Sequence, residues 1–126
     1  MTNLTALLDL DHLSAMTMGD VAVATEVLEI FKGQAATWGQ MLDSSAPRTH
    51  WADAAHTLKG AALGIGARPL AEICGRAEAL GRGDEDVSEA AAAVMLNDVR
   101  GALAQTLEAV HAAAHTIGLK ATFHAA

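Results

Sequence analysis

One segment of the sequence combines residue types that could do chemistry. Residues 55–67 read Ala-His-Thr-Leu-Lys-Gly-Ala-Ala-Leu-Gly-Ile-Gly-Ala. On a helix that turns by about 100° per residue, the apolar residues form one buried stripe and His56 points to the opposite, outer face. Lys59 follows at i, i+3, where its ammonium can reach a group bound to the imidazole ring. The pattern therefore indicates an exposed imidazole with a cation beside it.

Two glycines favour a functional interpretation of this outer face. Gly60 and Gly64 lie inside the expected helix, where each costs about 1 kcal/mol relative to alanine. We interpret Gly60 as a residue that keeps space open beside His56, so that another molecule can approach. From spacing alone, an ordinary exposed histidine and a solvated lysine remain alternatives for His56 and Lys59. The predicted docking surface consists of Ala52, Asp53, Leu63, Gly64 and Ala67.

Hydrophobic periodicity predicts that helices position these residues. Apolar residues recur at steps of three and four, the two prolines mark helix boundaries, and no segment alternates with the period of a strand. The predicted fold class is all-α, an antiparallel up-down four-helix bundle with a short extra N-terminal helix. We expect the short helix at about 9–16, with Asp9 as its cap. The first three long helices are expected from Asp20 to about 42, from Thr49 to about 66 and from Pro69 to about 81. The last is expected to begin with a capping box of Asp86 and Glu89 and to end at about 117.

Composition limits the function further. The 126 residues suit a single domain over 1–126, with a helical core at about 9–117 and flexible termini. Eight Lys and Arg against 15 Asp and Glu give a net charge of −7, which argues against nucleic-acid binding because phosphate neutralisation needs clustered cations. One cysteine excludes a disulfide framework and a Cys-rich zinc site. Neither a signal peptide nor a membrane span is recognisable, so we expect a cytoplasmic protein without a membrane partner.

The residues around His56 resemble the signature of histidine-containing phosphotransfer (HPt) domains of bacterial multistep phosphorelays. Residues 56–60 match the family pattern His-x-Leu-Lys-Gly, and two small residues and a Gly-Ala pair at 66–67 follow as in the family. Residues 9–13 and 27–31 are similar to the first two helices of the family. Leu70, Cys74 and Glu78 match positions in the helix after the signature. The resemblance covers about residues 9–115.

The resemblance implies that His56 is the phospho-accepting residue, shuttling a phosphoryl group between receiver-domain aspartates in a two-component phosphorelay. Imidazole is a competent nucleophile near neutral pH, and phosphoryl transfer mainly needs in-line positioning and charge neutralisation. Lys59 would add positive charge, and Gly60 would permit close approach. The chain lacks an ATP-binding kinase motif, so we expect a stoichiometric phosphotransfer carrier.

The expected partners are the receiver domains of a hybrid histidine kinase and of a response regulator. The receiver would bring Mg²⁺, whereas this chain is expected to bind no cofactor or metal and to be a monomer. His111 and His115 have the i, i+4 spacing of metal ligands, but alanines surround them.

Several points remain open from the sequence. An ionised Glu78 would repel a phosphoryl group, so its supporting role is uncertain, and a simple i, i+4 pair with Arg82 is the alternative. The alternative function is a non-catalytic bundle that docks a receiver and does not carry phosphate. A bundle that holds a metal or cofactor through inward side chains is a further alternative.

Overall fold

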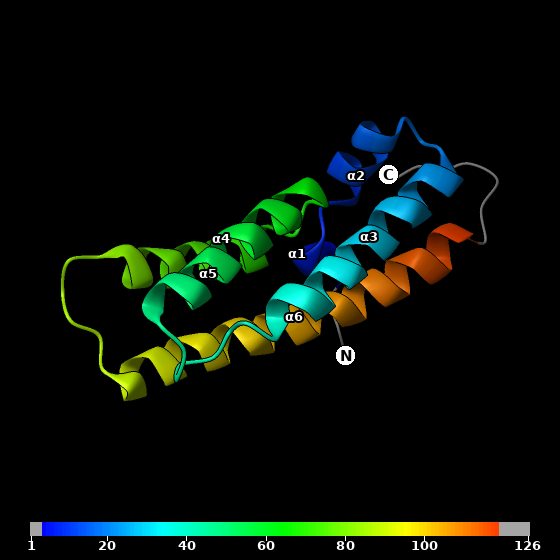
Figure 1. Cartoon of the computed structure of the whole chain (residues 1–126). Coiled ribbons are helices and arrows are strands. Elements are labelled where there is room, and N and C mark those ends of the chain that lie inside the picture. The colour runs from blue at the N-terminus through cyan, green and yellow to red at the C-terminus, as the bar shows by residue number, and fades with distance from the viewer. Residues whose placement is uncertain (1–3, 119–126) are drawn as a thin grey trace.

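The computed structural model describes residues 4–118, and this range contains six helices and no strand. They are α1 (Leu4–Leu7), α2 (Leu10–Thr17), α3 (Val21–Gly39), α4 (Arg48–Gly64), α5 (Arg68–Arg82) and α6 (Glu89–Gly118). The four long helices α3–α6 form an antiparallel up-down bundle, and α1 and α2 lie towards one end of it (Figure 1). The predicted fold class is therefore confirmed, although two short helices precede the bundle instead of one.

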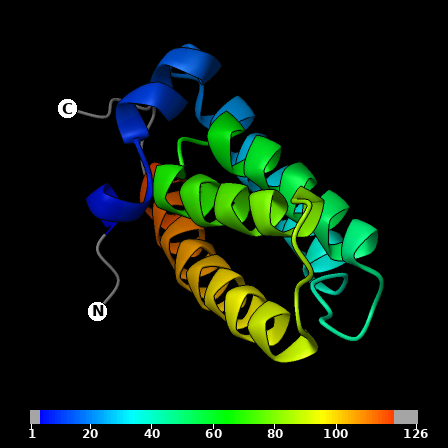
Figure 2. The same cartoon turned by 90° about the vertical axis from the view of Figure 1, so that its left-hand side faces the viewer.

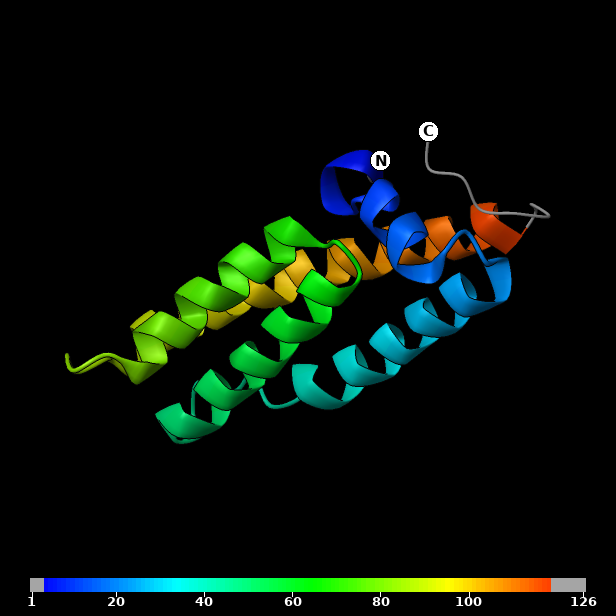
Figure 3. The same ribbon diagram turned by 90° about the horizontal axis from the view of Figure 1, so that it is seen from above.

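The order of the helices around the bundle decides which of them can build a site together. Both α4 and α6 pack against α3 and α5, so α4 and α6 occupy opposite corners (Figure 2). The most extensive contact joins α4 to α5. Seen from above, these two helices run antiparallel, with α5 beside the first half of α6 (Figure 3). Outward side chains of α4 and α5 are therefore close enough to meet.

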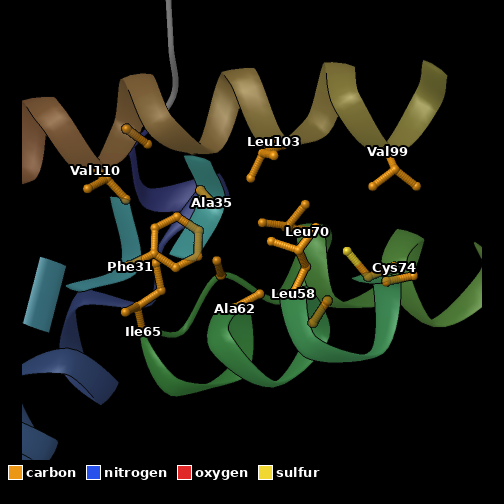
Figure 4. Packing of buried hydrophobic residues seen from close by; sticks show 14 of the residues in the cluster. Phe31, Ala35, Leu58, Ala62, Ile65, Leu70, Cys74, Val99, Leu103 and Val110 are labelled. Carbon is orange, nitrogen blue, oxygen red and sulfur yellow. The ribbon is translucent and has the colours of Figure 1, made fainter. Parts of the chain in front are cut away.

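Aliphatic side chains and alanines make up most of the core, together with two aromatic side chains. Trp51, Phe31, Leu58 and Leu70 are among the largest fully buried side chains. Figure 4 shows Leu58 of α4, Leu70 of α5 and Leu103 of α6 gathered in the same layer. Burying one such side chain contributes about 1.5–3 kcal/mol. This burial fixes one face of α4 inward and leaves the opposite face outward.

The predicted starts of α2 and α3 are confirmed, and α5 begins at Arg68, one residue before the predicted start at Pro69. The Asp9 carboxylate accepts the N–H of His12 at 3.0 Å before α2, and the Asp20 carboxylate accepts the N–H of Val23 at 3.1 Å before α3. Both caps satisfy backbone donors that have no partner within the helix. Pro69 lies in the first turn of α5, where its missing N–H leaves no bond unmade.

The predicted caps of α4 and α6 are wrong. α4 begins one residue before Thr49, and no side chain caps it. α6 begins at Glu89, where the hydroxyl of Ser88 accepts a backbone N–H at 3.1 Å. Asp86 and Glu89 therefore do not form a capping box, because Ser88 caps this helix.

The end of α4 is built around Gly66, whose φ of +76° lies in the left-handed region. The N–H groups of Gly66 and Ala67 bond back to the carbonyls of Leu63 at 3.2 Å and Ala62 at 2.8 Å, which is the pattern of a Schellman motif. The Gly66 carbonyl accepts the N–H of Asp9 at 2.9 Å, and a Cβ on Gly66 would lie 2.9 Å from the Asp9 carbonyl oxygen. The loop after α4 is thus closed against the start of α2.

The packed body begins before residue 9, where the core was predicted to start. α1 contacts α5 and α6, and Leu8 is buried. The flexible termini predicted at the two ends fall outside the described residues at 1–3 and 119–126. Of the helices described, none combines the length and the apolar character that a membrane crossing requires.

Arg48, at the start of α4, holds the end of α5. Its guanidinium donates to the carbonyls of Leu80 (3.1 Å), Gly81 (3.2 Å), Gly83 (2.8 Å) and Glu85 (2.9 Å). These are carbonyls of the last turn of α5 and of the loop after it, which lack partners within the helix. A cation at a helix C-terminus also interacts favourably with the helix dipole. Arg48 therefore fixes the start of α4 against the end of α5.

We expect Arg48→Met to lower the free energy of unfolding by about 2 kcal/mol, because it removes charge-assisted hydrogen bonds, those to the carbonyls of Leu80 and Gly81 being partly buried. Chemical denaturation measures this change. Arg76→Met, at an exposed position of α5, is the control and should change stability by less than about 0.5 kcal/mol. Equal stability losses in the two variants would contradict the capping role of Arg48.

Candidate functional site

His56 lies on the outer face of α4, and its side chain is 61% exposed. Its neighbours Ala55 and Leu58 are fully buried, so the burial of this stripe forces the imidazole to the outside. The predicted outward position of His56 is confirmed. Nδ1 of the ring lies 2.8 Å from Oε2 of Glu78 on α5, and this contact fixes the direction in which the ring faces.

Glu78 connects α4 and α5 through its carboxylate. Besides His56, Oε2 accepts the Nε–H of Arg82 at 3.0 Å, and Oε1 accepts an N–H of Lys59 at 3.1 Å. The Glu78 side chain is only 16% exposed. This partial burial acts to raise the pKa of Glu78, but the hydrogen bonds from Arg82, Lys59 and His56 outweigh it and lower the pKa from 4.5 to about 2. The carboxylate is therefore ionised at neutral pH.

Arg82 extends this network back to α4. Its Nη2 donates to Oδ1 of Asp53 at 2.9 Å while its Nε bonds to Glu78. The hydrogen bonds to Glu78 and Asp53 raise the pKa of the Arg82 guanidinium. The i, i+4 pair of Glu78 with Arg82, foreseen from spacing, is confirmed. The contacts of Glu78 with His56 and Lys59 were not foreseen, since they depend on the register between two helices.

The Lys59 side chain passes over Gly75 of α5 on its way to Glu78, and the missing side chain of this glycine leaves room for it. A Cβ built on Gly75 would lie 3.6 Å from Cδ of Lys59. The neighbouring Cys74 is buried, and this burial raises the pKa of its thiol to about 11, although the charge of Lys59 acts in the opposite direction. A thiol with so high a pKa is a poor nucleophile at neutral pH. The exposed nucleophilic group of the site is therefore His56.

One side of the site is open. A Cβ added to Gly60 or Gly64 would meet no atom within 4 Å apart from its own helix backbone and chain neighbours. Leu63 is 52% exposed, and Asp53 is exposed as well. The exposure of Asp53, Leu63 and Gly64 agrees with the predicted docking surface, whereas their part in docking stays a prediction.

Two members of the predicted docking surface are wrong, because Ala52 and Ala67 are completely buried. α5 approaches α4 so closely that a Cβ on Gly81 would lie 2.7 Å from both Ala52 and Trp51. Ala67 is buried because its N–H folds back onto α4 in the closed loop. A helical wheel drawn for α4 alone cannot show either approach.

An apolar groove near Gly64 was missed in the sequence. Its volume is about 230 Å³, and it runs between α2, α3 and α4. Met16 of α2 and Ile30 of α3 are exposed there. The lining residues include Met16, Val27, Ile30, Phe31, Ala61 and Gly64.

Among the residues that the structure describes, no three His, Cys, Asp or Glu side chains are arranged to hold a metal ion. His111 and His115 of α6 therefore have no third ligand within this part of the chain. The charged side chains around His56 are paired with one another in a network of ion pairs.

Comparison with known proteins gives two matches. The model of the Hpt domain family matches residues 26–113. The crystal structure of the histidine phosphotransferase ShpA from Caulobacter crescentus is similar, with a TM-score of 0.71 and 41% sequence identity, covering 89% of this chain and 94% of that chain. No curated protein sequence matches. Family model and solved structure thus agree with each other.

The lowered pKa of Glu78 predicts an acid-sensitive contribution to stability. Because the folded-state pKa lies below the ordinary value, this contribution is fully present above about pH 4.5 and is lost as the pH falls towards 2. We expect Glu78→Gln to be less stable than the parent above pH 5, and the difference to vanish near pH 2. Urea unfolding at several pH values measures it, with Glu72→Gln as the control for removal of an exposed carboxylate from α5. A difference that does not change with pH would refute this account.

Proposed function

Because the chain belongs to the Hpt domain family, whose members carry out histidine phosphotransfer in phosphorelays, we propose that His56 is the residue that accepts and donates the phosphoryl group. The observation that supports this proposal is the exposed imidazole, held by Glu78 at Nδ1. The match of residues 56–60 to the family signature supports the same residue.

The contact with Glu78 supports a proposal about which ring nitrogen reacts. An ionised carboxylate only accepts hydrogen bonds, so Nδ1 of His56 carries the proton that lies between the two groups. In the neutral ring Nε2 then keeps its lone pair, and it is the nitrogen not held by Glu78. We therefore assign Nε2 as the nucleophile. Orienting the ring in advance lowers the entropic cost of reaching an in-line geometry.

The remaining groups would support transfer by charge and by space. Phosphoryl transfer passes through a loose transition state that mainly needs positioning and neutralised charge. Lys59 has its ammonium at Glu78, within the same network as the imidazole. Mg²⁺ would be brought by the receiver domain. Gly60 leaves room for the partner to come close to the ring.

Hpt domains interact with receiver domains, and for this chain we propose the receivers of a hybrid histidine kinase and of a response regulator. Leu63, the glycines and the apolar groove near Gly64 would form the apolar part of that contact. We further propose that the chain acts as a monomer in the cytoplasm. The network leaves the exposed face of α4 accessible, which suits transient docking.

We expect His56→Gln to abolish phosphoryl acceptance from a phosphorylated receiver in the presence of Mg²⁺. The fold should persist, because the side chain is exposed. His50→Gln, at an exposed position of the same helix, is the matched control and should accept phosphate as the parent does. Radiolabelled transfer resolved on a gel measures the result.

Undiminished labelling of His56→Gln would overturn the assignment of His56. If the parent protein binds receivers and never takes up an acid-labile phosphate, the chain is a docking module that does not carry phosphate.

Gly60 offers a separate test of close approach. Gly60→Leu should fold at least as stably as the parent, because the added side chain meets open space and leucine is the better helix former. Transfer should nevertheless fall by at least about tenfold, the equivalent of about 1.4 kcal/mol in the barrier. Gly101→Leu, on α6 with equally open surroundings, is the control and should leave the rate unchanged. Equal rates in the two variants would contradict the role of Gly60.

A further inference from the structure

The charges around His56 are balanced before any phosphoryl group arrives. Two carboxylates, of Glu78 and Asp53, face two cations, of Lys59 and Arg82, and their formal charges cancel. Each of these four side chains bonds to at least one group of opposite charge. A phosphoryl group on Nε2 would therefore have to compete with carboxylates for either cation.

Arg82 is held from two sides. Its Nε bonds to the same Glu78 oxygen that contacts His56, at 3.0 Å and 2.8 Å respectively. Its Nη2 is held by Asp53 at 2.9 Å. Asp53 lies three residues before His56 on the exposed face of α4. α4 thus carries both the imidazole and the carboxylate that holds the guanidinium of Arg82.

We propose that Asp53 is a positioning residue that keeps Arg82 engaged and so limits its contact with the phosphoryl group on His56. This inference rests on the proposed function of His56. Without a guanidinium to neutralise it, the phosphoryl group is less stable on the imidazole. Asp53 thereby shifts the equilibrium of transfer from His56 towards the receiver aspartate.

The transfer itself needs no proton movement at the site. The Nε2 lone pair attacks the phosphorus of the aspartyl phosphate, an N–P bond forms, and the P–O bond breaks with its electron pair leaving on the receiver carboxylate. Nδ1 keeps its proton, so the ring becomes cationic beside Glu78. In the onward step a carboxylate oxygen attacks phosphorus and the N–P electron pair returns to Nε2. Asp53 is absent from both bond changes, and its effect is on the energy of the phosphorylated state.

This role differs measurably from a role of Asp53 in docking. At protein concentrations far below the dissociation constant of the complex, almost no complex is present. At fixed total amounts, the equilibrium ratio of phosphorylated His56 to phosphorylated receiver then depends only on the free energies of the unbound proteins with and without the phosphoryl group. A docking residue changes the forward and reverse rates together and leaves that ratio unchanged. A residue that changes the energy of phosphorylated His56 changes the ratio itself.

The experiment measures this ratio for the full chain with a radiolabelled receiver domain and Mg²⁺, approached from both directions. Asp53→Asn should raise the ratio about threefold, as expected for one exposed ion pair, and added salt should shrink the effect. Asp98→Asn, at an exposed position of α6, removes the same charge elsewhere and should leave the ratio unchanged. In an Arg82→Gln background, Asp53→Asn should have no further effect, because the two residues act through one interaction.

Equal ratios of phosphorylated His56 to phosphorylated receiver for Asp53→Asn and Asp98→Asn would overturn the inference. A change in the forward and reverse transfer rates of Asp53→Asn without a change in this ratio would overturn it as well. An effect of Asp53→Asn that persists in the Arg82→Gln background would also overturn it, since Asp53 would then act by its own charge. If the parent protein takes no label while its receiver is phosphorylated, the proposed function fails instead. The two failures are therefore distinguishable.

Discussion

The carboxylate of Glu78 is the group on which the rest of the site depends. It accepts hydrogen bonds from an imidazole and a lysine of α4 and from an arginine of its own helix. Hydrogen bonds to an ionised group are about twice as strong as those between neutral groups, and partial burial shields these from water. A neutral side chain could orient the ring, but it would not hold two cations next to it. The charge of Glu78 thus sets both the ring orientation and the electrostatic balance around it.

Glu78 reaches α4 only because the two helices approach closely and in one register. Gly81 leaves no room for a Cβ against Trp51 and Ala52, and Arg48 binds the last turn of α5 from the start of α4. At the other end, the closed loop at Gly66 fixes where α5 begins. These contacts restrain both ends of the helix pair, so the middle, where His56 and Glu78 meet, has little freedom to shift.

The sequence predicted most of what depends on one helix, apart from the caps of α4 and α6, and it missed what depends on two helices. The apolar period of α4 places Leu58 inward and His56 outward, and the Asp9 and Asp20 caps are readable from residue type alone. The burial of Ala52 was missed because it depends on Gly81, which lies on another helix. Glu78 was correctly paired with Arg82 at i, i+4, whereas its contacts with α4 depend on inter-helix register, which no spacing within one helix records.

The net charge of −7 and the ion pairs around His56 together limit the electrostatic attraction between this chain and an acidic partner. Lys59 and Arg82 would be the natural attraction for an acidic partner, yet both are already paired with carboxylates. Long-range attraction is therefore weak, and paired surface charges contribute little to affinity. The docking proposed above would then depend on shape and apolar contact at short range, where Gly60 and Gly64 leave space and Leu63 is exposed. For the proposed carrier, such a surface would keep the affinity for each receiver low, and among related complexes low affinity mostly reflects fast dissociation, which suits release after transfer.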